Sequence, residues 1–200
     1  MIVITLTLGQ LQANCYLVIC PQTEKTIIID PADDANFISE KILREKLKPI
    51  AIIATHGHFD HILAARELQL AFNIPFFVHR NDQKILLKMN QSASWWLKRK
   101  IIESPPKINK FLKENETVKL GQEKLRVMEI PGHTPGSICL YNQEEKILFS
   151  GDTIFKNKIG RTDFSYSLPQ SMKKSLKKIK QKFTGFLIYT GHGENFTLTT

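Results

Sequence analysis

The chain has 200 residues, 42% of them apolar and 24% charged, and its 28 basic and 19 acidic side chains give a net charge of +9. These values are typical of a globular protein and exclude a disordered or fibrous one, and we predict a single domain over residues 1–200. No apolar run approaches the roughly 18 residues of a membrane span, and no secretory signal pattern is evident. The three cysteines indicate no disulfide framework. We therefore expect a soluble protein of the reducing cytoplasm, without a membrane partner.

In the first half of the chain, apolar runs with strand character alternate with patterns of helical spacing. The predicted strands cover residues 2–8, 15–19, 26–30, 50–54 and 76–79. The predicted helices cover residues 35–47 and 62–72. Three strands before the first helix, followed by strands that alternate with helices, indicate a sheet in which antiparallel and parallel pairs are mixed.

Residues 81–116 do not fit this rhythm, because they carry Trp95 and Trp96 and then the breaker pair Pro105-Pro106. We interpret the segment as a helical insertion beside the functional site. Two hypotheses for the tryptophans stay open. They line the space for a substrate, or they anchor the insertion on the body of the protein or at a contact between subunits. A homo-oligomer is compatible with the second hypothesis.

The second half of the chain repeats the sequence of strands followed by a helix. The predicted strands cover residues 117–119, 124–130, 137–141, 147–150 and 186–190, and the predicted helix covers residues 169–182. Met172, Leu176 and Ile179 are expected on the inner face of that helix. The whole pattern predicts an α/β (α+β) fold, in which two mixed β-sheets pack together with helices outside, an αββα sandwich.

Two segments concentrate the positive charge, residues 84–113 and residues 169–182, and the second holds six lysines and no acidic residue. Such charge could attract nucleic acid, anionic lipid or an acidic substrate. Gly-rich phosphate loops and interleaved aromatic stripes are absent. We therefore interpret the lysines as a solvated helix face and expect no nucleic-acid partner.

A dense group of polar residues follows the predicted strand at residues 50–54. His56, His58, Asp60 and His61 all lie within six residues. Imidazole nitrogens and carboxylate oxygens suit Zn²⁺, Fe²⁺ or Mn²⁺, and such a group would be unfavourable in a core unless it were paired or bound to metal. This spacing predicts a metal site at the end of the strand.

Three further candidates follow predicted strands of the second half, each beside glycine: His133, Asp152 and His192. Together with the first group they account for five of the six histidines, and we interpret the sixth, His79, as structural. The three cysteines lie in strand-like runs and are expected in the core rather than as nucleophiles.

This set of motifs resembles the metallo-β-lactamase superfamily over essentially the whole chain. Within it, the chain is similar to short hydrolases related to glyoxalase II, the hydroxyacylglutathione hydrolases. Supporting motifs are Asn14-Cys15-Tyr16-Leu17, Asp30-Pro31, Gly151-Asp152-Thr153-Ile154-Phe155 and Gly160-Arg161-Thr162-Asp163-Phe164. The resemblance implies the metallo-β-lactamase fold and is far more specific for the superfamily than for the substrate.

Carried over residue by residue, the resemblance implies two adjacent divalent metal ions, with zinc expected first and iron or manganese as alternatives. The first ion would be held by His56, His58 and His133. The second would be held by Asp60, His61 and His192. Asp152 would bridge the two ions, so Asp60 and Asp152 are the expected acidic residues of catalysis. The implied nucleophile is a hydroxide between the metals, which needs no catalytic serine or cysteine.

The chain departs from the longer glyoxalase II enzymes in the region expected to bind the substrate. It ends soon after His192, whereas those enzymes continue into a helical region that helps to bind glutathione. Arg161 and Asp163 stand where they have Lys and Tyr, and Tyr166-Ser167 replaces the Gly-Gly of the short relatives. We expect Arg161 and Asp163 to bind the substrate. The alternative is an internal ion pair of Arg161 with Asp163 or Asp30.

The expected function is hydrolysis of a small-molecule acyl thioester, such as S-lactoylglutathione, at a dinuclear metal site. The alternative is a mononuclear iron persulfide dioxygenase, which would use only the equivalents of His56, His133 and Asp152. The long middle segment and the sequence Gly191-His192-Gly193 favour the hydrolase. A nuclease of the same superfamily is suggested by charge alone, and a non-enzymatic module would be expected to lack part of the ligand set. A β-lactamase is not expected, because such enzymes usually lack Asp at the bridging position.

Overall fold

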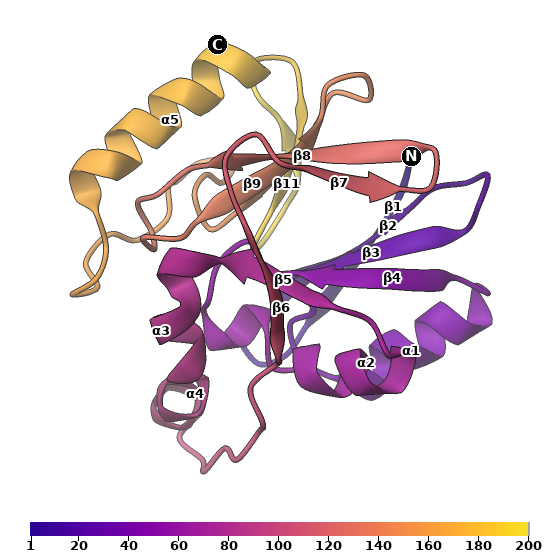
Figure 1. Ribbon diagram of the computed structural model, residues 1–200. Helices are drawn as coiled ribbons and strands as arrows, with labels where there is room; N and C mark the ends of the chain where they lie inside the picture. Colours follow the sequence, from indigo (N-terminus) through magenta and orange to yellow (C-terminus); the bar gives the residue numbers. More distant parts are fainter. Residues whose placement is uncertain (200) are drawn as a thin grey trace.

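In the computed structural model, which describes residues 1–199, two six-stranded β-sheets pack face to face and helices cover their outer sides (Figure 1). The strand order is β1-β2-β3-β4-β5-β6 in the first sheet and β12-β11-β10-β9-β8-β7 in the second. Each half of the chain therefore builds one sheet. The predicted αββα sandwich of two mixed sheets is confirmed.

The first sheet combines antiparallel and parallel pairs. Its strands are β1 (Ile2–Leu8), β2 (Ala13–Ile19), β3 (Lys25–Ile29), β4 (Lys48–Ile53), β5 (Phe76–His79) and β6 (Ile108–Leu112). Strands β1 to β3 pair antiparallel, and β3 to β6 pair parallel. Parallel neighbours need crossover connections, and α1 (Ala35–Arg44) and α2 (Ala65–Phe72) supply two of them on the outer face of the sheet.

The second sheet is antiparallel except for one pair. Its strands are β7 (Thr117–Leu120), β8 (Glu123–Glu129), β9 (Ile138–Asn142), β10 (Ile147–Gly151), β11 (Leu187–Thr190) and β12 (Phe196–Thr197). Strands β10 and β11 are parallel, and the crossover between them is α5 (Pro169–Phe183), which covers the other outer side of the molecule. The carboxyl ends of β10 and β11 consequently lie side by side.

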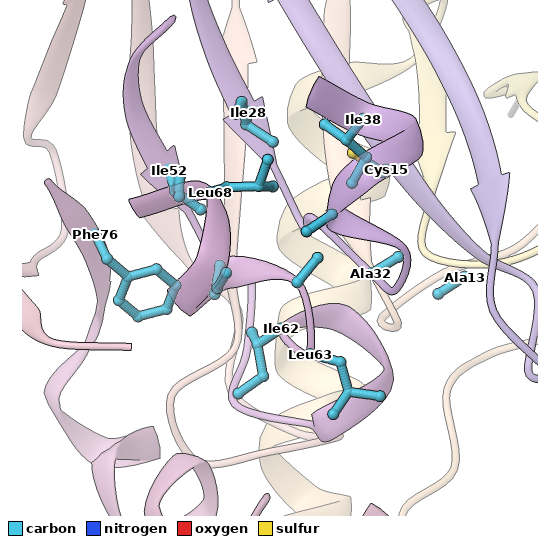
Figure 2. Close-up of a cluster of buried hydrophobic side chains, with 14 of the residues drawn as sticks. Ala13, Cys15, Ile28, Ala32, Ile38, Ile52, Ile62, Leu63, Leu68 and Phe76 are labelled. Atoms are coloured by element: carbon cyan, nitrogen blue, oxygen red, sulfur yellow. The ribbon is translucent and has the colours of Figure 1, made fainter. Parts of the chain in front are cut away.

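The first sheet divides the core into two clusters, one on each of its faces. Side chains at alternate positions of its strands face α1 and α2, where Ile28 and Ile52 pack with Ile38 and Leu68 (Figure 2). The intervening positions face the second sheet, as Ile29 does. Because both faces are covered, all seven residues of β2 are buried, which is why the central strands have continuous rather than alternating apolar runs.

The lysine-rich helix α5 packs against the second sheet, and together they form a third cluster of buried apolar residues. Met172, Ile179 and Phe183 are buried and Leu176 is partly buried, so the predicted inner face is confirmed. Its lysines are exposed. Within residues 1–199, this helix and the others are too short or too polar to cross a bilayer. All three cysteines are free and buried, in agreement with the prediction that they are core residues.

The predicted helical insertion over residues 81–116 is only partly correct. A 3₁₀ turn, η2 (Arg80–Asp82), leads into α3 (Gln83–Leu87) and α4 (Met89–Leu97), but the segment ends as strand β6. This strand is the edge of the first sheet and is paired only with β5. Its exposed Asn109 and Lys110 hide the strand pattern. The predicted helix 62–72 also begins later, because residues 59–61 form the 3₁₀ turn η1 (Phe59–His61).

Candidate metal centre

The predicted ligand residues lie at the carboxyl ends of four strands. His56, His58, Asp60 and His61 follow β4, while the other three follow β8, β10 and β11 of the second sheet. Two backbone hydrogen bonds join segments beside the site, from Ile138 N to Thr55 O (2.9 Å) and from Asn14 N to Gly191 O (2.8 Å). The first half of the chain therefore supplies four residues and the second half three, as the sequence predicts.

One group consists of His56, His58 and His133. Nδ1 of His58 lies 3.1 Å from Nε2 of His56 and 2.9 Å from Nε2 of His133. Three imidazole nitrogens from two sheets thus converge on one point, with every donor atom within 4.8 Å of the others. Such convergence suits a tetrahedral or octahedral cation with nitrogen ligands.

A second group consists of Asp60, His61 and His192. Nε2 of His192 lies 3.3 Å from Nε2 of His61 and 3.3 Å from Oδ2 of Asp60. These three donor atoms also lie within 4.8 Å of one another. The loop after β4 therefore contributes to both groups.

The Asp152 carboxylate lies between the two groups. Its Oδ1 is 3.5 Å from Nε2 of His61, and its Oδ2 is 3.6 Å from Nε2 of both His133 and His192. Among the described residues, the buried Oδ1 has no hydrogen-bond donor. Because a buried carboxylate oxygen without a partner is strongly unfavourable, this atom is the observation that best fits a cation between the groups.

Three histidines have one ring nitrogen next to a hydrogen-bond acceptor outside the metal-binding groups, and this contact determines which nitrogen faces into the groups. Nδ1 of His133 lies 2.8 Å from the carbonyl oxygen of Arg161, and Nδ1 of His192 lies 3.0 Å from that of Leu11. Nδ1 of His61 lies 3.1 Å from Oδ2 of Asp30. Carbonyl and carboxylate oxygens only accept hydrogen bonds, so each neutral ring carries its proton on Nδ1 and turns the lone pair of Nε2 inward. The residues present therefore fit two metal ions.

Asp30 orients a further histidine through Thr55. Oδ1 of Asp30 accepts the Thr55 backbone N–H at 2.7 Å, and Oδ2 accepts the Thr55 hydroxyl proton at 2.7 Å. The Thr55 oxygen is then free to accept from Nδ1 of His56, which lies 3.1 Å away. One buried carboxylate thus holds His56 and His61. The sequence did not predict this role of Asp30, although an acid at the end of β3, directly beside β4, is a signal for it.

Asp82 is a second buried acid whose role the sequence did not reveal. Its carboxylate accepts hydrogen bonds from the backbone of Gly57 (2.8 Å) and Gly136 (2.7 Å) and from the Thr134 hydroxyl (2.7 Å). It therefore ties the loop after β4 to the loop that carries His133. The acid itself lies in the segment after β5, and no local motif marks it.

Burial and neighbouring charges shift the pKa values of the ligand residues, lowering some and raising others. Burial, followed by the neighbouring histidines, lowers the pKa of His56 well below 6.5 and that of His58 to about 3. Burial has the same tendency at His61, but the Asp152 and Asp60 carboxylates outweigh it and raise the pKa of His61. For Asp152, burial favours the neutral acid, but His61 holds its pKa well below the usual range. His56 and His58 are therefore neutral beside the ionised Asp152 carboxylate, as metal binding requires, whereas the carboxylates favour the charged form of His61.

Position 191 requires glycine because its backbone lies against side chains of the metal-binding groups. A Cβ atom at this position would overlap Oδ1 of Asp152 and would lie 2.9 Å from Cε1 of His61. The backbone before His192 therefore passes directly against the shared carboxylate. This explains why a glycine precedes the last predicted ligand.

A cavity of about 340 Å³ opens over the two groups. Besides five of the seven ligand-type residues, its lining includes aromatic and cationic side chains: Phe59, Trp96, Phe155, Phe164, Tyr166, Lys158 and Arg161. Trp96 faces this space, whereas Trp95 is 63% exposed and is not part of the lining. The hypothesis that both tryptophans line the substrate space is therefore wrong for Trp95.

The predicted substrate residues Arg161 and Asp163 form an ion pair. Nε and Nη2 of Arg161 lie 2.9 and 2.8 Å from the two carboxylate oxygens of Asp163, and both side chains are exposed. The alternative ion pair is thus present, with Asp163 and not Asp30 as the partner. Arg161 also lines the cavity, and its guanidinium carbon lies 4.7 Å from the centre of the Phe164 ring. Asp163 is not part of the lining.

Comparison with known proteins agrees with this geometry. Residues 8–192 match the family described as the metallo-beta-lactamase superfamily. The chain is 31% identical over 196 residues to the hydroxyacylglutathione hydrolase GloC of Haemophilus influenzae, an alignment that covers 94% of this chain and 88% of that protein.

Two solved structures are also similar to the chain. TTHA1623 in a di-iron-bound form has a TM-score of 0.88 and 31% identity, over 97% of this chain and 94% of that one. The BLEG-1 B3 metallo-beta-lactamase has a TM-score of 0.89 and 32% identity, over 98% of this chain and 94% of that one. Since the family match spans nearly the whole chain, the protein belongs to the metallo-β-lactamase superfamily.

Proposed function

We propose that the protein is a metal-dependent hydrolase of acyl thioesters, of the hydroxyacylglutathione hydrolase type. The observation that carries the proposal is the Asp152 carboxylate, which lies between two complete groups of ligand-type side chains and has a buried oxygen without a donor. The name of the Haemophilus influenzae relative supports the thioester as the substrate class.

In this proposal, His56, His58 and His133 would hold one divalent ion, Asp60, His61 and His192 would hold the other, and Asp152 would contribute to both sites. Zinc is the first candidate, and the di-iron form of TTHA1623 makes iron a serious alternative. When bound, such a pair of ions would lower the pKa of a coordinated water molecule to about 7 and would polarise the substrate carbonyl. Asp60 and Asp152 would supply the negative charge that offsets the two cations and would accept hydrogen bonds from a water molecule at the site.

The rest of the cavity would bind the substrate. Its aromatic walls suit an apolar acyl or thiol group, while Lys158 and Arg161 suit an anionic part of the molecule. Among the described residues that line the cavity, the acidic ones are Asp60 and Asp152, and Asp163 lies outside the lining, paired with Arg161. A small thioester with a carboxylate on its thiol carrier fits these features.

The test combines metal content with turnover on three substrates. We expect two metal ions per chain and hydrolysis of S-lactoylglutathione, measured as loss of thioester absorbance. Oxygen consumption on glutathione persulfide with one iron per chain would replace the proposal with the dioxygenase. A β-lactam is the third substrate, because of the likeness to BLEG-1. If the β-lactam is hydrolysed and the thioester is not, the proposed substrate class is wrong.

His192→Ala should reduce metal content from two ions per chain to about one. The variant removes one of three donors of the second group, and the loss of turnover should exceed the roughly 10–100-fold change that follows loss of an outer hydrogen-bond partner. An enzyme with a single ion bound at the first group would keep that ion in the His192→Ala variant. His79→Ala is the matched control, since His79 pairs with Glu129 outside the centre (3.2 Å). Unchanged metal content in His192→Ala, measured by elemental analysis, contradicts the dinuclear proposal.

Arg161→Ala should raise KM for an anionic thioester by roughly tenfold or more, because hydrogen bonds to charged groups contribute about 1.5–3 kcal/mol. Thermal stability should hardly change, since the ion pair with Asp163 is exposed and exposed pairs contribute little to stability. Asp163→Asn is the control: it frees the guanidinium and should leave KM equal or lower. If melting falls by several degrees in Arg161→Ala while KM is unchanged, Arg161 is a structural residue.

A further inference from the structure

Tyr166 connects the cavity wall to the first histidine group. It lies in the segment between β10 and α5, more than a hundred positions after His58 in the chain, and its hydroxyl oxygen is 2.7 Å from Nε2 of His58. The side chain is partly buried and lines the cavity. Among residues 1–199, His58 is the one hydrogen-bond partner of this hydroxyl.

The segment around Tyr166 is held in place from both sides of the residue. The Ser167 hydroxyl donates to the carbonyl oxygen of His133 (2.7 Å), and the Leu168 N–H donates to that of Gly132 (2.8 Å). The Tyr166 ring also stacks on Phe164, with ring centres 5.5 Å apart and planes 14° from parallel. Tyr166 therefore has a fixed position relative to the loop that carries His133.

The direction of the hydrogen bond follows from the other face of the His58 ring. Its Nδ1 lies within 3.1 Å of the inward nitrogens of His56 and His133, so Nδ1 is the atom that turns its lone pair inward. A neutral imidazole carries one N–H, which is then on Nε2 and is donated to the Tyr166 oxygen. The hydroxyl proton of Tyr166 is not used in this bond. It is available to an acceptor in the cavity.

We propose that Tyr166 acts twice: it holds His58 with Nδ1 inward, and its hydroxyl donates a hydrogen bond to the substrate carbonyl oxygen. The second role rests on the proposed thioester hydrolysis, whereas the first concerns metal binding alone. A fixed donor beside the reacting carbonyl stabilises the negative charge that develops on that oxygen. Tyr166 would thus contribute to the rate of the reaction, while Arg161 and Lys158 would contribute to substrate binding.

The test is Tyr166→Phe, which keeps the stacked ring and removes only the hydroxyl. Ser165→Ala, an exposed neighbour in the same segment, is the control. Zinc affinity of the variant, measured by competition with a chromophoric chelator, should fall by roughly tenfold or more. In the zinc-loaded protein, NMR should lose the slowly exchanging Nε2–H proton of His58. With S-lactoylglutathione, kcat should fall by roughly 100-fold, with little change in KM.

Each outcome decides one role. Unchanged zinc affinity together with a retained His58 proton overturns the positioning role. Weakened zinc affinity with an unchanged kcat at saturating zinc overturns the donor role. If the wild-type protein does not hydrolyse the thioester, the proposed function and the donor role fail together. The zinc affinity and the imidazole proton still decide the positioning role in that case.

Discussion

Asp152→Ala is expected to lose both metal ions and nearly all turnover. The carboxylate lies between the two metal-binding groups, at 3.5 Å from His61 and 3.6 Å from His133 and His192. Its removal leaves five imidazoles facing one another with less of the negative charge that offsets two cations. The loss of turnover should exceed the roughly 10–100-fold effect of removing an outer partner.

Asp152→Asn separates charge from volume. The amide has nearly the same size, but it carries no charge and places a donor N–H among nitrogen lone pairs, so it should bind at most one ion and should also be severely impaired. Glu144→Ala is the control, because Glu144 is an exposed acid far from the site. Metal content by elemental analysis and thioester turnover are the measurements. Two bound ions and near-normal turnover in either Asp152 variant would show that the dinuclear proposal is wrong.

The ligand-type residues could be predicted because each follows an apolar run. Strands with continuous apolar side chains, such as the run before His56, are recognisable in sequence, and polar residues just beyond them must lie at a strand end. The convergence of four strand ends on one site came from resemblance rather than from the pattern itself. The structure shows the geometric reason, since β10 and β11 run parallel and their ends lie beside that of β4 at the junction of the two sheets.

The groups that support the ligands could not be predicted from local patterns. Asp82 reaches Gly57 and Gly136 from a segment that belongs to neither loop, and only the folded chain brings the three together. Tyr166 contacts His58 across more than a hundred residues. Strand β6 was missed for a different reason: an edge strand with polar side chains has no alternating apolar pattern.

Asp30→Ala should impair both metal-binding groups and destabilise the fold. The buried carboxylate accepts three hydrogen bonds, from the N–H and hydroxyl of Thr55 and from Nδ1 of His61. Each buried donor left without a partner costs about 1–3 kcal/mol, so unfolding should require at least about 3 kcal/mol less free energy. For a chain of this length, that corresponds to a fall in Tm of roughly 6–12 °C. Calorimetry on the metal-free protein measures this effect.

Asp30→Asn tests the orienting role with less damage to the fold. If the amide oxygen keeps the Thr55 N–H, the NH₂ group replaces Oδ2 and faces the Thr55 hydroxyl and Nδ1 of His61. The hydroxyl would then donate to Nδ1 of His56, which moves the ring proton to the inward nitrogen and opposes metal binding. Zinc affinity should fall by roughly 10–100-fold while Tm changes less than in Asp30→Ala. Asp33→Ala, a partly exposed acid nearby, should change neither property. If Asp30→Asn binds zinc as tightly as the wild-type protein, Asp30 supports the fold without orienting the histidines.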